Sequence, residues 1–150
     1  IVWLPHYLVT FHARRGNNLG TLYTVVESYS GSFSVLESQP KLAEAPLTEN
    51  VLPVGSPPET AAKTARESLA VATLRNREMK RVSIGALLHT DLIYLPFWVC
   101  HYKRRRQRQD FVAIDAQSGK TVPAKLKNAI MSAFIATYKQ KNSASLTHRD

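Results

Sequence analysis

The sequence predicts an α+β fold in which two repeated antiparallel β-hairpin units form one or two sheets, packed by two amphipathic helices. Three observations lead there: a segment near the N-terminus recurs near the C-terminus, two segments have helical periodicity, and the composition is that of a folded domain. The chain has 150 residues, of which 44% are hydrophobic and 21% charged. A chain of this size can bury a core without disulfides or metals, so we expect most of it to fold.

The internal repeat is the strongest signal. Residues 2–15 (VWLPHYLVTFHARR) align without a gap with residues 93–106 (IYLPFWVCHYKRRR), at an offset of 91 residues. After a loop three residues shorter in the second copy, residues 22–35 align with residues 110–123 at an offset of 88, so that Ser30-Gly31 recurs as Ser118-Gly119. β-branched and aromatic residues alternate in these segments, as is typical of strands. Each copy therefore predicts a strand, a polar loop, a second strand and a tight turn in which glycine takes positive φ.

The repeat divides the chain into four parts. Residues 1–38 form the first hairpin repeat, and residues 39–56, which are rich in proline and lack a period, form a connector. Residues 57–138 hold a helix, the second hairpin repeat and a C-terminal helix, and the polar residues 139–150 form a flexible tail. The chain opens on a strand-like run without Met, which is typical of a processed protein or of a piece of a longer one.

Two helices are predicted. Ser56 is expected to cap the first, with Pro57 at its first position and Glu59 completing the capping box, and this helix should run to about Met79. Its apolar positions recur at near-helical spacing: Ala62, Ala65, Leu69, Ala72 and Met79. A short strand is expected over residues 81–89. The second helix covers residues 124–140, with one apolar face made of Leu126, Ala129, Ile130, Ala133, Phe134 and Thr137.

Residues 56–123 resemble the repeat of the PepSY family, in which a helix packs on a small antiparallel sheet. The matching residues are Phe111, Ile114, Asp115, Ser118, Gly119 and Lys120. In the first copy the same places hold Tyr23, Val26, Glu27, Ser30 and Gly31, but Ser32 replaces the lysine and no helix precedes the hairpin. The resemblance implies a noncatalytic accessory or regulatory module, often associated with secreted enzymes or cell-envelope proteins, and it supplies no active site.

The residues with catalytic or metal-binding chemistry do not cluster in the sequence. The five histidines, His6, His12, His89, His101 and His148, have no close spacing, and a single cysteine is present. We therefore predict no metal site and no cofactor. Cys100 is expected to be a small buried hydrophobe, because it lies in an apolar run, and on a strand it points away from its neighbour His101. Glu27 and Asp115 precede the equivalent turns and are expected to brace them. No catalytic residues are assigned, and we predict that the chain is not an enzyme.

Two functional classes remain. The first is a noncatalytic binding or regulatory module that acts through protein–protein contacts, using strand edges or aromatic side chains. The candidate partner-binding aromatics are Trp3, Tyr7, Tyr94 and Trp98, which occupy alternating strand positions together with Phe11 and Tyr102. Packing of these aromatics in the core is the alternative explanation.

The second class is polyanion binding, to nucleic acid or an anionic surface, through basic hairpin tips. The chain carries 20 Lys and Arg against 11 Asp and Glu, a net charge of +9, which favours polyanionic partners. The candidates are Arg14, Arg15, Lys103, Arg104, Arg105, Arg106 and Arg108. A solvated loop would have the same composition.

The sequence gives few signals of cellular location. No apolar run approaches the ~20 residues that span a bilayer, so we expect no membrane span and a soluble chain. A single cysteine implies no oxidising compartment and fits the cytoplasm best. The compartment, the oligomeric state and the specific ligand stay open at this level.

Overall fold

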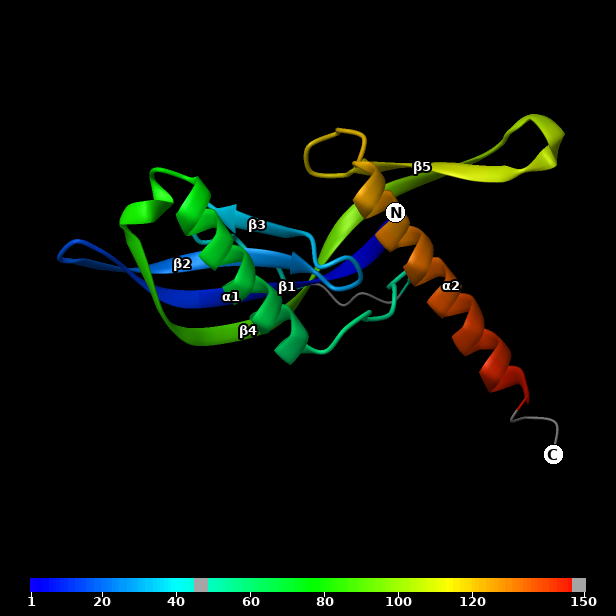
Figure 1. The fold of residues 1–150 in the computed structure, drawn as a ribbon. Helices are drawn as coiled ribbons and strands as arrows, with labels where there is room; N and C mark the ends of the chain where they lie inside the picture. The colour runs from blue at the N-terminus through cyan, green and yellow to red at the C-terminus, as the bar shows by residue number, and fades with distance from the viewer. Residues whose placement is uncertain (45–48, 147–150) are drawn as a thin grey trace. The chain divides into compact units, whose positions relative to one another are not determined.

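The computed structural model describes residues 1–44 and 49–146, and its fold is α+β with two helices and one five-stranded antiparallel sheet (Figure 1). The elements in chain order are β1 Val2–Arg15, β2 Asn18–Glu27, β3 Phe33–Leu36, α1 Pro58–Arg75, β4 Val82–Lys103, β5 Gln109–Asp115 and α2 Ala124–Leu146. Short 3₁₀ helices cover Met79–Arg81 and Arg105–Gln107. The strands follow the order β3-β2-β1-β4-β5. The predicted α+β class is confirmed. The sequence predicted either one sheet or two, and the structure has one.

The chain divides into two compact units. The first, here called the α1 unit, is built on most of β1, on β2, β3 and α1, and on the first part of β4 up to Ile93. The second, the α2 unit, holds the rest of β4 from Tyr94, β5, α2 and the first residues of β1. Each unit contains one long hairpin and one helix, and each has its own buried side chains.

The core of the α1 unit lies between α1 and the β1–β2 hairpin, which Figure 1 shows in green and blue. It is formed by Tyr7, Val9, Phe11, Val26, Ala61, Ala65 and Leu69. The three helix residues recur every fourth position and so lie on one face of α1. Alanine at two of them lets the helix approach the strands closely enough to contact the large rings of Tyr7 and Phe11.

The core of the α2 unit lies between α2 and the β4–β5 hairpin. The helix buries Ala129, Ile130 and Ala133, as its apolar face predicted. Phe134 of α2 packs edge-on against Phe111 of β5, with ring centroids 5.8 Å apart, and lies 6.0 Å from the ring of His101 of β4. These contacts place α2 on the face of the hairpin that carries His101 and Phe111.

The two hairpins pair their strands in the same way. In β1–β2, Tyr7 lies opposite Val26. In β4–β5, Trp98 lies opposite Ile114. The sequence alignment matches Tyr7 with Trp98 and Val26 with Ile114, and the same correspondence holds along both ladders.

The start of α1 differs from the prediction. Its N-cap is Pro57, no side chain caps it, and the carbonyl of Ser56 instead accepts a hydrogen bond of 2.7 Å from the hydroxyl of Tyr7. A proline N-cap has neither a side-chain acceptor nor an N–H, so the predicted capping box cannot form at Pro57. α1 also ends at Arg75 rather than near Met79.

The other element boundaries differ as well. The short strand expected over residues 81–89 is the first part of one continuous strand, β4. α2 continues through the polar residues after Lys139 to Leu146, where a flexible tail was expected; residues 147–150 lie outside the described residues. Residues 45–48 of the connector also lie outside them. The connector touches the sheet at Val51, which forms a parallel bridge to Trp3.

Candidate protein-binding site

The turn after β2 is held together by the carboxylate of Glu27. This side chain is 2% exposed, and its two oxygens accept hydrogen bonds from the backbone N–H groups of Tyr29 (2.7 Å) and Ser30 (2.6 Å) and from the Ser30 hydroxyl. Gly31 follows with φ of 67°, and its N–H donates to the Glu27 carbonyl (3.0 Å). Glycine takes positive φ without the steric cost that a Cβ would add, which explains why Gly31 stands at this position of the turn.

The turn after β5 repeats this pattern around Asp115. Its carboxylate accepts bonds from the N–H of Gln117 and the hydroxyl of Ser118, both at 2.9 Å. Gly119 has φ of 70° and its N–H donates to the Asp115 carbonyl at 2.8 Å. The expectation that Glu27 and Asp115 brace their turns is therefore confirmed.

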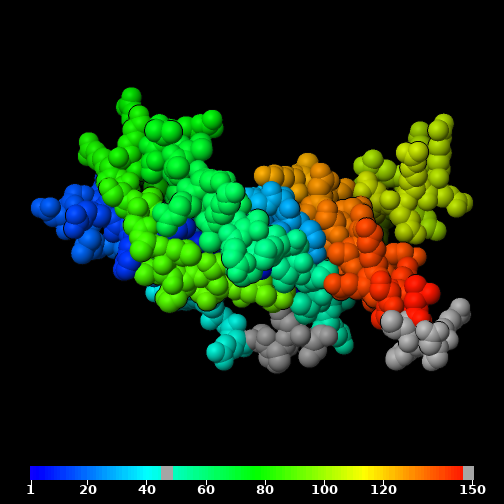
Figure 2. All heavy atoms as spheres, turned by 60° about the horizontal axis from the view of Figure 1, so that its bottom comes forward, coloured from blue at the N-terminus to red at the C-terminus, as the bar shows by residue number. Residues whose placement is uncertain are grey.

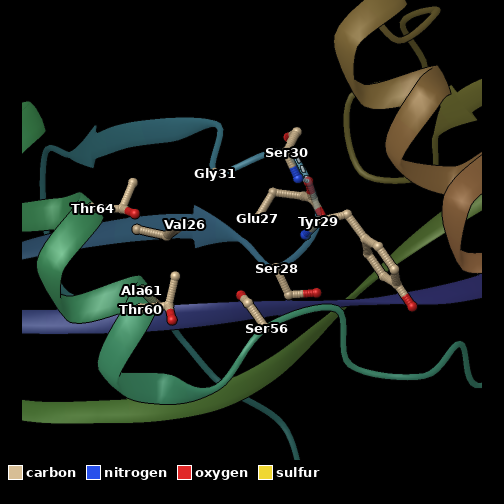
Figure 3. A pocket seen from close by; sticks show the side chains of 10 residues that line it. All are labelled: Val26, Glu27, Ser28, Tyr29, Ser30, Gly31, Ser56, Thr60, Ala61 and Thr64. Carbon is tan, nitrogen blue, oxygen red and sulfur yellow. Dashed lines mark hydrogen bonds between the residues drawn. The ribbon is translucent and has the colours of Figure 1, made fainter.

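A shallow hollow of about 220 Å³ lies in the α1 unit between the Glu27 turn and the first turns of α1. Figure 3 shows hydroxyl side chains around it, with Thr60 and Thr64 on α1 and Ser28 and Ser56 on the loops. The acid group of this hollow is Glu27, and its oxygens are already engaged by the turn. Partial burial and, to a lesser extent, the negative charge of Glu27 raise the pKa of Tyr29. The hydrogen bonds of Glu27 therefore hold this turn together.

The main surface feature of the α2 unit is the face of the β4–β5 hairpin opposite α2. Directly opposed residues of an antiparallel pair share a face, so Trp98, Cys100 and Tyr102 of β4 lie beside Ile114 and Val112 of β5. We call these five residues the Trp98 face. Trp98 is 51% and Tyr102 39% exposed, Cys100 is exposed, and the two β5 residues are half-buried. Cys100 was expected to be buried; that was wrong, because α2 covers the other face of this hairpin.

The tip of the same hairpin is strongly basic. Lys103, Arg104, Arg105, Arg106 and Arg108 are all exposed, and Figure 2 shows this part of the chain, in yellow-green, as a protrusion beside the orange α2. The tip turns through Arg106, whose φ is 69°. Among the residues described, Arg104 is the one tip cation with an ion pair, to Asp110 at 2.9 Å.

Asp110 joins the tip of the hairpin to α2 through hydrogen bonds and ion pairs. One carboxylate oxygen accepts bonds from the Nζ of Lys127 on α2 and from the N–H of Phe111, both at 2.8 Å. The other accepts from the hydroxyl of Tyr102 (3.1 Å) and the Nε of Arg104 (2.9 Å). The bond from Lys127, followed by that from Phe111, lowers the pKa of Asp110 to about 2. The hydroxyl of Tyr102 and then the charge of Asp110 raise the pKa of Arg104.

The candidate site residues from the sequence are placed as follows. Arg14 and Arg15 are exposed at the end of β1 in the α1 unit, and the five other basic candidates form the tip in the α2 unit. Of the aromatic candidates, Tyr7 is 4% exposed and belongs to the core, Trp3 and Tyr94 are half-buried, and Trp98 is on the surface.

Sequence reasoning missed part of this surface. It did not assign Cys100, Val112 or Ile114 to a surface with Trp98, although strand alternation places Trp98, Cys100 and Tyr102 on one face. The sequence did not show on which face of the β4–β5 hairpin α2 packs, and so it did not show which face is exposed. The bond between Lys127 and Asp110 was missed as well, because no local pattern connects residues 17 positions apart across a turn.

No family model, no curated protein and no solved structure matches this chain. Within residues 1–44 and 49–146, no group of three or more His, Cys, Asp or Glu side chains is placed to hold a metal ion. Neither helix in the described part of the chain is long and apolar enough to cross a bilayer.

Proposed function

We propose that the chain is a noncatalytic binding or regulatory module that acts through protein–protein contacts, and that the Trp98 face is its binding surface. The observation that carries this is the exposure of a tryptophan, a tyrosine and a free cysteine side by side on one sheet face. Aromatic residues flanked by cations are the composition of energetically important centres in protein interfaces. A contiguous apolar surface of this kind on a folded domain marks interaction sites.

The proposal includes a shared origin of the two hairpins as copies of one unit. It is supported by the matching cross-strand partners in both ladders and by similar hydrogen bonds around Glu27 and Asp115, each of which accepts from the N–H two residues on and the serine hydroxyl three residues on. The resemblance of the second turn to the PepSY repeat agrees with a regulatory role. On this basis, the residues of this face in the first hairpin pack in the core, and the equivalent residues of the second hairpin contact a partner.

Photocrosslinking from Cys100 tests the proposal, because this single cysteine lies within the surface. The chain carrying a benzophenone at Cys100 is irradiated in an extract of the source cells, with unlabelled chain as competitor. We expect one dominant adduct that the unlabelled wild type abolishes and that Trp98→Asp does not. Tyr138→Asp is the matched control, since Tyr138 is an aromatic of α2 in the same unit and is 68% exposed. Equal competition by wild type and Trp98→Asp would reject this surface.

Polyanion binding by the β4–β5 tip is the second candidate. It is favoured by the four tip cations, Lys103, Arg105, Arg106 and Arg108, for which the described residues provide no ion pair. Such cations can neutralise phosphates, and the affinity then falls steeply with salt. The test is retention on heparin and affinity for nonspecific DNA at low salt.

The variant for that test changes Arg105, Arg106 and Arg108 together to Ala and leaves Arg104 with Asp110. Earlier elution from heparin and a shallower salt slope for DNA support polyanion binding. Unchanged retention excludes it. Arg14→Ala combined with Arg15→Ala reports separately on the other basic tip.

A further inference from the structure

We propose that the Trp98 face binds an amphipathic α-helix of a partner, with small apolar side chains spaced four residues apart and acidic side chains toward the hairpin tip. This inference rests on the proposed function and specifies the partner. Its starting point is a difference between two equivalent sheet faces. One is covered by a helix of this chain and the other is open.

The aligned residues of the first hairpin show what fits such a face. Tyr7, Val9 and Phe11 correspond to Trp98, Cys100 and Tyr102, and their neighbours Thr24 and Val26 correspond to Val112 and Ile114. All five residues of the first hairpin are between 0% and 4% exposed. α1 covers them through Ala61, Ala65 and Leu69.

In the second hairpin the helix lies on the other side. α2 packs by Phe134 on His101 and Phe111, so the face equivalent to the one beneath α1 is open. Its strand pairing and side-chain spacing are those of a face that a helix already covers in this same chain. A helix with alanines at i and i+4 therefore has the shape that this surface accepts.

The cations at the β4–β5 tip indicate which charge the partner helix carries near it. In the α1 unit, the guanidinium of Arg66 on the helix lies 5.0 Å from the ring centroid of Phe11 and donates to the carbonyl of Gly85 at 3.3 Å. On the second hairpin the equivalent ring, Tyr102, already has a cation near it, because the guanidinium of Arg104, just beyond the end of β4, lies 6.0 Å from its centroid. A helix with arginine at that position would meet like charge. Arg104 is already paired with Asp110, which lies opposite Tyr102, so an acidic residue of the partner would meet the tip cations that have no ion pair among the described residues: Lys103, Arg105, Arg106 and Arg108.

The probe is a peptide derived from α1. It comprises residues 58–75, with Lys63 and Glu67 replaced by an i,i+4 hydrocarbon staple and with Arg66→Glu. Lys63 and Glu67 point to solvent, their side chains being 78% and 68% exposed, so the staple leaves the packing face intact. A staple is needed because an isolated helix of this length is marginal in water. Matched peptides retain Arg66 or carry Ala65→Arg.

Two readouts on the full chain follow occupancy: fluorescence anisotropy of the labelled peptide, and the rate at which Cys100 reacts with a thiol reagent. We expect saturable binding that protects Cys100 in proportion to occupancy. The Arg66→Glu peptide should bind about fivefold tighter than the Arg66 peptide at low salt, and this preference should disappear at high salt. The Ala65→Arg peptide, and the Trp98→Asp chain with any peptide, should show no protection. The Tyr138→Asp chain should behave as wild type.

Failure to protect Cys100, or equal binding to the Trp98→Asp chain, overturns the helix inference. The proposed function is judged separately by the crosslinking competition, which does not depend on the shape of the partner. Sedimentation of the chain alone tests whether a second copy of the chain occupies this face. A dimer that dissociates on Trp98→Asp would make a second copy the occupant and would also overturn the helix inference.

Discussion

Truncation of two aligned aromatics, Phe11 and Tyr102, should have very different effects on stability. Phe11→Ala removes a ring that is 0% exposed and packs beneath α1. Losing a buried phenylalanine costs about 3–5 kcal/mol, and the lost contact with the Arg66 guanidinium is included in that range. We expect a decrease of about 4 kcal/mol in the free energy of unfolding.

Tyr102→Ala changes the equivalent residue of the second hairpin, which is 39% exposed. It removes two solvent-accessible hydrogen bonds of the Tyr102 hydroxyl, one donated to Asp110 at 3.1 Å and one accepted from Arg104 at 3.3 Å, and leaves no cavity in the core. The expected cost is about 1 kcal/mol or less. Urea titration followed by far-UV circular dichroism measures both variants against the wild type. Equal costs would refute the conclusion that α1 covers Phe11 whereas α2 leaves the aligned Tyr102 uncovered.

Three further outcomes follow from the same contacts. Gly31→Ala and Gly119→Ala should each lower the free energy of unfolding by about 1 kcal/mol, because both backbones have positive φ, of 67° and 70°; thermal melts test this, and an effect in one turn only would contradict the equivalence. Asp110 has a folded pKa of about 2, below the unfolded value of about 3.9. The ionised carboxylate of Asp110 therefore adds to the free energy of unfolding above about pH 4, and this stabilisation is lost as the pH falls toward 2. Asp110→Asn should remove that part of the acid sensitivity in a pH series of melts, whereas an unchanged profile would show that the carboxylate contributes nothing. Cys100 should react with a thiol reagent in the native chain without denaturant, and reaction only after unfolding would contradict its exposure.

The local patterns predicted much of this fold. Strand alternation and the Ser-Gly turns predicted both hairpins. The two aligned segments also pair in the same cross-strand register, because side-chain period and turn geometry together fix how a hairpin pairs. The helical spacing of Ala129, Ile130 and Ala133 gave the buried side of α2. These signals are contained within a few residues of each other.

The side of each hairpin on which a helix packs was not predictable in this way. Aligned residues such as Val9 and Cys100 have the same local pattern, yet the first is 0% exposed and the second is exposed. Their burial depends on where α1 and α2 pack, which is a long-range property of the chain. For the same reason the sequence expected Cys100 in a core.

The central claim is that a partner covers the Trp98 face. It is tested most directly by the alkylation rate of Cys100 in intact source cells, measured with a membrane-permeant maleimide and compared with the rate in the purified chain. We predict that Cys100 is protected in cells and reactive when purified, and that Trp98→Asp restores the reactivity in cells. The same rate in both settings would contradict the claim.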